Sequence, residues 1–174
     1  LLARFPAARG YGVDVSRDAI RFACRRPAAR AGRLSLAVAS CYRLPVADGA
    51  TDAVTELFSV LAADEYRRVL RPGGLLVLAV PDADHLMGLK EILYERPYPN
   101  ERGEDTLPGF ALTGERSVRF TLTLDDPASI RALFEMTPYA YRTGAAGRDA
   151  LLSTRRLTTP ASFRVLTYRR EQST

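Results

Sequence analysis

A tight turn that runs straight into an apolar segment decides the fold: Leu70-Arg71-Pro72-Gly73-Gly74-Leu75-Leu76-Val77-Leu78-Ala79-Val80. Proline presets its own φ and glycine tolerates positive φ, so Pro72-Gly73-Gly74 favours a reversal of the chain. The segment 75–80 contains no polar residue, which is typical of a strand buried on both faces of a parallel sheet. The sequence therefore predicts a parallel sheet covered by helices.

Upstream of this turn, extended apolar segments alternate with helical ones. We expect strands at 10–14, 34–39 and 52–57, and helices at 17–26 and 62–70. Ser16 is expected to cap the first helix, and Pro27 to stop it. This alternation predicts an α/β fold with a Rossmann-like parallel sheet between helices.

Downstream, apolar residues recur at helical spacing between 86 and 93, and Asp82 or Asp84 is expected to cap that helix. The proline-rich and charged segment 96–108 predicts a loop. Alternation over 118–124 predicts a strand with one buried face, and Asp126-Pro127 opens a helix with an apolar face. We expect a further helix at 148–156 and a last strand around 163–168.

The composition is that of a single globular domain, with 174 residues, 47% hydrophobic and 26% charged. No apolar run is long enough to cross a bilayer, and the first residues do not form a signal peptide. Cys24 and Cys41 stand outside any Cys-x-x-Cys pair, so we expect reduced thiols, no metal site and a cytoplasmic location. The net charge of +5 favours a polyanion such as RNA as partner, and a solvated basic surface explains it equally well.

Asp14 ends the first predicted strand and is the first candidate site residue. Ligands of open α/β sheets bind at the carboxyl ends of the strands, where a carboxylate can accept hydrogen bonds from both hydroxyls of a ribose. Alternatively, Asp14 helps to cap the helix that follows. The position alone does not separate these two interpretations.

Four pieces in a fixed order then carry a resemblance: Asp14, Leu44-Pro45, Asp52-Ala53-Val54 and Leu70-Arg71-Pro72-Gly73-Gly74. In this order they resemble the class I S-adenosylmethionine-dependent methyltransferases. The resemblance implies a seven-stranded Rossmann-like sheet and S-adenosyl-L-methionine as cofactor. It also implies that Asp14, with Val15 beside it, contacts the cofactor at its ribose, and that Ser40 and Cys41 flank the adenine.

Two further runs, 81–90 and 134–142, narrow the resemblance to the bacterial 23S rRNA guanine-N1-methyltransferases. The family patterns are His-Leu-Met-x-Leu-Lys and Met-Thr-Pro-Phe/Tyr-x-Trp-Arg, and this chain has Tyr141 where the family usually has Trp. The family includes macrolide-resistance enzymes of antibiotic-producing actinomycetes. The resemblance therefore implies rRNA processing, RNA binding and 23S rRNA as partner.

The same resemblance assigns roles to single residues. It makes His85 a contact of the methionine portion of the cofactor, whereas otherwise His85 is an exposed cap. Lys90 reaches the same carboxylate or an RNA phosphate, or lies on a solvated face. Tyr139 and Tyr141 stack a flipped-out guanine, or pack in the core, and Phe58 keeps the aromatic ring of the substrate loop. The sequence does not identify a general base.

The chain departs from the family in two places. The four-cysteine zinc module, the first strand and the Asp-x-Gly-x-Gly-x-Gly cofactor loop have no counterpart in residues 1–174. We therefore expect a partial methyltransferase domain, truncated at its N-terminus, with zinc only in the absent module and inactive as a fragment. In addition, Phe58-Ser59-Val60-Leu61 stands where the family has a Tyr-Ala-Pro-Cys-like run, so the proline is missing.

The predicted function is methylation of guanine N1 in 23S rRNA, with the modified nucleotide, oligomeric state and any resistance role left open. One alternative is a small-molecule methyltransferase of secondary metabolism or quinone synthesis, which shares the four ordered pieces but not the runs 81–90 and 134–142. The other is a non-catalytic remnant that binds RNA without modifying it.

Overall fold

The computed structural model describes residues 1–172, with nothing described of the side chains of residues 28 and 30. Its helices and strands in chain order are β1 (Gly10–Asp14), α1 (Arg17–Ala23), α2 (Pro27–Arg30), β2 (Leu34–Val38), β3 (Thr51–Leu57), α3 (Ala63–Val69), β4 (Leu70–Pro81), α4 (Met87–Leu93), β5 (Phe110–Leu124), α5 (Pro127–Glu135), the 3-10 helix η1 (Pro138–Tyr141), α6 (Ala145–Ser153) and β6 (Leu157–Arg170). None of the described helices has the length and apolar character needed to span a membrane.

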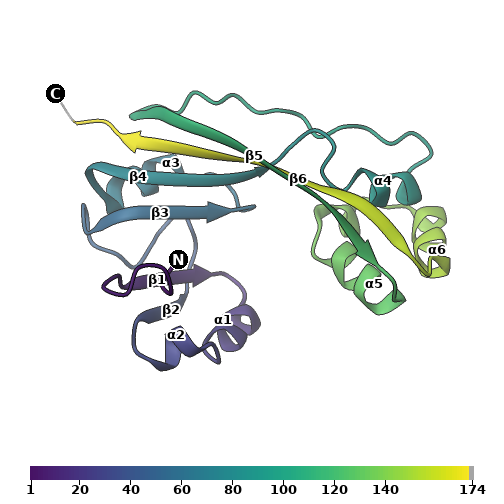
Figure 1. Ribbon diagram of the computed structural model, residues 1–174, viewed down its shortest axis with the longest axis horizontal. Coiled ribbons are helices and arrows are strands. Elements are labelled where there is room, and N and C mark those ends of the chain that lie inside the picture. Colours follow the sequence, from purple (N-terminus) through teal and green to yellow (C-terminus); the bar gives the residue numbers. More distant parts are fainter. Residues whose placement is uncertain (173–174) are drawn as a thin grey trace.

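The strands form two sheets (Figure 1). β1 and β2 make a parallel pair, and the second sheet has the order β3-β4-β6-β5. β3 and β4 are parallel, while β6 runs antiparallel to both β4 and β5. The predicted α/β fold is confirmed. In Figure 1, β1, β3 and β4 run in the same direction, so their carboxyl ends lie on one side of the molecule.

The predicted turn lies at the start of β4. Thr51 pairs with Leu70 and Ala53 with Leu75, so residues 71–74 form an irregularity in the ladder. Gly73 has a φ of 74°, in the left-handed region. A Cβ on Gly74 would lie 2.8 Å from the carbonyl oxygen of Arg71. The two glycines therefore allow a tight local turn inside β4, where the sequence predicted a reversal before the strand, and β4 keeps one direction from Leu70 to Pro81.

Two apolar clusters stabilise the larger sheet. The first packs α3 and the 107–110 segment onto one face of the sheet, around Leu70, Leu76, Leu78 and Tyr168. The second packs α4, α5 and α6 around the start of β6, with Leu89, Ile130, Phe134 and Leu157 at its centre. Burial of these side chains is the main favourable contribution to the free energy of folding.

Several elements differ from the sequence prediction. Neither Asp82 nor Asp84 caps α4. Its N-cap is Leu86, in the left-handed region at φ 56° and without a side-chain cap. The physical reason is tertiary: the Leu86 side chain is buried, and its N–H donates to the carbonyl oxygen of Pro160 at 2.8 Å. Asp84 instead pairs with Arg119 across the fold.

The strand predicted at 118–124 begins at Phe110, and its central part has no buried face. Phe120 is 53% exposed, because only the last residues of β5 reach the helical cluster. The helix predicted at 148–156 begins at Ala145. The earlier start is explained by packing of α6 against α4. A Cβ on Gly147 would lie 2.3 Å from the carbonyl oxygen of Leu93, so this glycine permits the close contact between the two helices. The first helix ends at Ala23, and Pro27 begins α2 rather than only stopping α1.

Candidate active site

Asp14 stands at the carboxyl end of β1. Its Oδ1 accepts the N–H of Ser16 at 2.7 Å, and Ser16 itself caps α1 by accepting the N–H of Ala19 at 3.2 Å. Capping is therefore the role of Ser16, and Asp14 supports the turn before it. Among the described residues, Oδ2 of Asp14 has no hydrogen-bond partner, so one carboxylate oxygen remains available for a ligand.

The end of β2 brings the next predicted residues beside Asp14. Asp14 is opposite Val38 in the ladder, and its carbonyl oxygen accepts the N–H of Ala39 at 3.1 Å. Ser40 follows directly, and its hydroxyl oxygen accepts the N–H of Tyr42 at 3.2 Å. Val15 is exposed beside Asp14. Two strand ends thus present a carboxylate, a hydroxyl and an apolar side chain together.

Cys41 is placed differently from its neighbours. Its Sγ donates to the carbonyl oxygen of Val60 at 3.7 Å, in the loop that follows β3. It also packs against the first apolar cluster. The thiol therefore connects the loop after β2 to the loop after β3.

Aromatic rings from four segments meet beyond the carboxyl ends of β3 and β4. Phe58 stacks on His85 with ring centroids 6.1 Å apart and an interplanar angle of 11°. Phe163 lies 4.6 Å from His85 and 5.1 Å from Phe58, and Phe120 lies 6.2 Å from Phe163. Phe58 is 56% exposed, so the group offers an accessible apolar surface. We call these four residues the aromatic platform.

The environment of His85 determines its protonation. Burial lowers the pKa of His85, and the positive charge of Lys90 lowers it further. Its Nδ1 accepts the backbone N–H of Ser162 at 3.3 Å. A neutral imidazole whose Nδ1 accepts must carry its proton on Nε2. Nε2 has no partner among the described residues, so His85 contributes a free N–H donor to the platform.

Lys90 does not lie on a solvated face and does not reach outward to a phosphate. It is fully buried, and its Nζ donates to the carbonyl oxygen of Tyr98 at 2.8 Å and to Oδ1 of Asn100 at 2.7 Å. Burial lowers the pKa of Lys90. Nδ2 of Asn100 donates to the carbonyl oxygens of Asp82 and His85 at 2.9 and 3.2 Å. Lys90 therefore holds the long loop against the segment that carries His85.

Tyr139 and Tyr141 do not form a pair. The hydroxyl of Tyr139 donates to Oδ1 of Asn100 at 3.3 Å, and Nζ of Lys90 lies 5.4 Å from the Tyr139 ring. Burial raises the pKa of Tyr139 to about 12. Tyr141 is 89% exposed. The two tyrosines of η1 thus differ in exposure: Tyr139 packs against the second apolar cluster, and Tyr141 faces solvent.

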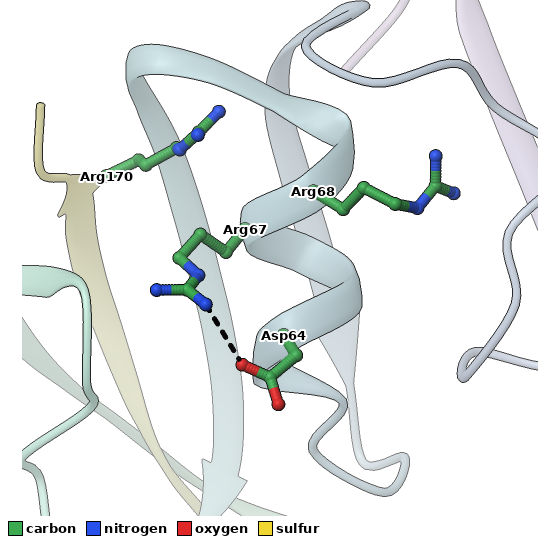
Figure 2. Close-up of a pocket in the computed structure, with 4 residues that line it drawn as sticks. All are labelled: Asp64, Arg67, Arg68 and Arg170. Atoms are coloured by element: carbon green, nitrogen blue, oxygen red, sulfur yellow. Dashed lines mark hydrogen bonds and ion pairs between the residues drawn. The ribbon is translucent and has the colours of Figure 1, made fainter. Parts of the chain in front are cut away.

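A surface pocket lies at the opposite edge of the sheet, lined by Asp64, Arg67, Arg68 and Arg170 (Figure 2). In Figure 2, Arg68 points away from Arg67 and Arg170. Arg68 binds Glu65 and Asp48, Arg67 pairs with Asp64, and Arg170 donates to the carbonyl oxygen of Leu70. The arginines of this pocket are therefore already engaged within the chain. The pocket lies near the start of β4, away from the strand ends that carry Asp14 and His85.

The residues at the carboxyl edge fit the nucleoside half of S-adenosylmethionine. An available carboxylate oxygen suits a ribose diol, and the exposed side chain of Val15 beside Ser40 suits an adenine ring. The sequence pointed to Asp14, Ser40 and His85, and missed the contributions of Phe120 and Phe163. The pattern of apolar residues around Phe120 and Phe163 predicted only strands. How close these rings come to Phe58 is set by the pairing of distant strands, which the pattern does not show.

Comparison with known proteins places methyltransferases among the sequence relatives of this chain. A family model described as a methyltransferase domain matches residues 1–74. The 23S rRNA (guanine(748)-N(1))-methyltransferase of Streptomyces fradiae is 36% identical over 133 residues, which cover 74% of this chain and 46% of that protein. A Micromonospora griseorubida protein, provisionally named as a 23S rRNA (guanine-N(1)-)-methyltransferase, is 34% identical over 177 residues and covers 97% of this chain and 58% of its own length. The chain thus spans about half the length of these relatives.

Solved structures agree on the fold. A Bacillus halodurans structure, provisionally assigned as a methyltransferase, matches 98% of this chain and 86% of its own with a TM-score of 0.60 and 14% identity. The methyltransferase-domain match and these relatives support a class I S-adenosylmethionine-dependent methyltransferase domain, and the solved structure agrees on its fold. Within that class it lies near the 23S rRNA guanine-N1-methyltransferases.

Proposed function

We propose that this chain is the methyl-transfer part of an enzyme that methylates N1 of a guanine in 23S rRNA. The observation that carries the proposal is the aromatic platform at the edge of the sheet where cofactors of this class bind. Aromatic rings stack on any nucleobase, and an enzyme that modifies a base edge must take the base out of its stack. The names of the sequence relatives support the choice of rRNA as substrate.

The cofactor supplies an electrophilic methyl group on its sulfonium. In this proposal, Asp14 binds the ribose through its available oxygen, with Val15, Ser40 and Cys41 around the nucleoside. His85 donates its Nε2–H to the methionine carboxylate. Because Asp14 ends β1 and His85 accepts an N–H from β6, the domain contributes mainly by bringing the reactants together in one orientation.

On the substrate side, Phe58 and its platform neighbours hold the guanine. Tyr141 is exposed on η1, where it can reach a neighbouring nucleotide. N1 of guanine must lose a proton as it accepts the methyl group. Zinc binding, the location in the cell and any resistance role stay predictions from the resemblance.

The first experiment measures methyl transfer from radiolabelled S-adenosylmethionine to 23S rRNA and to a panel of quinones and phenolic metabolites. A methyl group on N1 blocks the Watson–Crick edge, so reverse transcription stops at the modified guanine. The assay uses the chain alone and the chain joined to the N-terminal portion of the Streptomyces fradiae relative, since residues 1–174 contain no Asp-x-Gly-x-Gly-x-Gly loop. We expect transfer to rRNA by the joined protein. Transfer to metabolites only would refute the rRNA assignment.

A second experiment tests the cofactor site by calorimetric titration with S-adenosylmethionine. Asp14→Asn removes the charge that a ribose diol prefers, and we expect the Kd to rise about tenfold or more. Asp18→Asn is the matched control, because Asp18 is an exposed acid four residues away that pairs with Arg21. Equal cofactor affinity in the two variants would contradict the role of Asp14.

A further inference from the structure

The loop that follows β3 carries Phe58 in an unusual backbone conformation. Phe58 has a φ of 59°, in the left-handed region that residues other than glycine rarely adopt. The residues after it, Ser59-Val60-Leu61, contain no proline that would fix the backbone. Such a conformation persists only where surrounding contacts determine it. The question is which contacts hold this loop in place.

Three side chains bind the backbone of this loop. Oε1 of Glu56 accepts the N–H of Ser59. The hydroxyl of Tyr66 and Sγ of Cys41 both donate to the carbonyl oxygen of Val60, at 3.3 and 3.7 Å. These side chains come from β3, α3 and the loop after β2. They satisfy the polar backbone of the loop while Phe58, Val60 and Leu61 stay exposed.

Glu56 is the central member of this group. It is 6% exposed, and it is the one carboxylate among the buried side chains of the described residues. It lies on the same face of β3 as Val54, next to the first apolar cluster. A buried carboxylate without a cationic partner is costly, so its retention calls for a reason beyond packing. Among the described residues, its side chain forms one hydrogen bond, to the N–H of the residue directly after Phe58.

The consequence reaches the platform. The N–H of Phe58 donates to the carbonyl oxygen of Ala79 at 3.2 Å, and its ring stacks on His85. We infer that Glu56 is a positioning residue of the transfer site: it fixes the turn at Ser59, with Tyr66 and Cys41 as second anchors at Val60, so that the Phe58 ring stays parallel to His85. This inference rests on the proposed function for its importance in catalysis, but not for the geometry that it predicts.

The test uses the fact that His85 is the only histidine in the sequence. Its imidazole carbon and proton NMR signals therefore report on one ring, and the stacked Phe58 shifts them upfield. Phe58→Ala defines the signal positions without the stacked ring. Glu56→Leu keeps the volume of a buried side chain but removes the acceptor, and Glu56→Gln keeps an acceptor oxygen. Glu104→Gln, at an exposed loop position, is the control.

We expect Glu56→Leu to move the His85 signals to the positions seen in Phe58→Ala. We expect Glu56→Gln to leave them near their wild-type positions. In the joined protein, Glu56→Leu should lower kcat about tenfold or more with little change in the KM for S-adenosylmethionine. Wild-type His85 signals in a folded Glu56→Leu variant would overturn the inference. If that variant does not fold, Tyr66→Phe removes an anchor of Val60 and must shift the same signals. The NMR readout needs no activity, so it decides this inference even if rRNA proves not to be the substrate.

Discussion

Residues 1–38 and the four-stranded sheet use the same kinds of strands and helices, yet they differ in what they bury. None of the described side chains before Glu56 is buried, although β1, β2 and α1 form with regular geometry and a good cap. The four-stranded part contains both apolar clusters. An isolated two-stranded sheet is marginally stable at best. Correct local structure is therefore not the same as stability, which comes from packing partners.

The loop after β2 connects the two regions. Arg68 on α3 donates to the carbonyl oxygens of Leu44 and Val46 at 3.1 and 2.8 Å and pairs with Asp48. Glu65 accepts the N–H of Leu44 at 2.6 Å. Arg68 and the hydrogen bond to Leu44 lower the pKa of Glu65 to about 2. The adenine side of the candidate site is thus attached to the stable region through one loop.

The largest expected difference in the free energy of unfolding is between alanine variants of two leucines in the middle of strands. Leu76 is fully buried in β4, and Leu36 is half-buried in β2. We expect Leu76→Ala to lower the free energy of unfolding by about 3–5 kcal/mol, and Leu36→Ala by less than about 1 kcal/mol. Urea unfolding followed by circular dichroism measures both. Similar losses would show that β2 has packing partners equivalent to those of β4.

The next comparison is between two cations that hold chain segments. Removing Lys90 leaves the Tyr98 carbonyl without this donor and the Asn100 amide oxygen with the weaker bond from the Tyr139 hydroxyl. We expect Lys90→Ala to cost about 2–4 kcal/mol in urea unfolding. Arg33 likewise donates to the carbonyl oxygens of Leu2 and Phe5, at 2.7 and 2.8 Å.

Because those carbonyls lie near solvent, Arg33→Ala should leave the global unfolding free energy almost unchanged. It should instead speed amide exchange and proteolysis within residues 1–8. A loss as large as that of Lys90→Ala would mean that the first region unfolds together with the sheet.

Helix caps give a smaller difference. Asp126 caps α5 by accepting the N–H of Ser129 at 2.7 Å, and Ser16 caps α1. Asp126→Ala should cost about 1 kcal/mol, since α5 packs in the second cluster. Ser16→Ala should lower the free energy of unfolding by only about 0.3 kcal/mol. Its main effect should be faster amide exchange in α1. The opposite ranking would place α1 in the cooperative unit.

The smallest expected effect is the pH dependence from His85. Its folded pKa is lowered from 6.5, so the folded state binds this proton more weakly than the unfolded state. Stability is therefore full above pH about 6.5 and falls as the pH drops through 6.5 to the folded pKa. His85→Gln should remove this slope in urea titrations at pH 5–8. A slope that survives the substitution would have to come from another group.

The local elements were largely predictable because they depend on neighbouring residues. Asp126-Pro127 and Ser16 begin helices through their own side chains, and Pro72-Gly73-Gly74 forms its turn through its own backbone freedom. Sequence resemblance also placed the class of protein. The αL cap at Leu86 and the early start of α6 were missed, since each depends on a contact with a distant segment, Pro160 and Leu93 respectively.

The sequence by itself determined the order of the strands and of the helices other than α2 and η1, the turn near the start of β4 and the residues at the end of β1, since all of these follow from short-range sterics and hydrogen bonds. Only the tertiary structure decided that Phe58, His85, Phe120 and Phe163 share one surface, that Lys90 is buried, and that Tyr139 and Tyr141 are separated. The same holds for the burial of Glu56 beneath the Phe58 loop. These features depend on pairing between strands far apart in the chain. The neighbours that set burial and charge there cannot be predicted from the periodicity of the sequence.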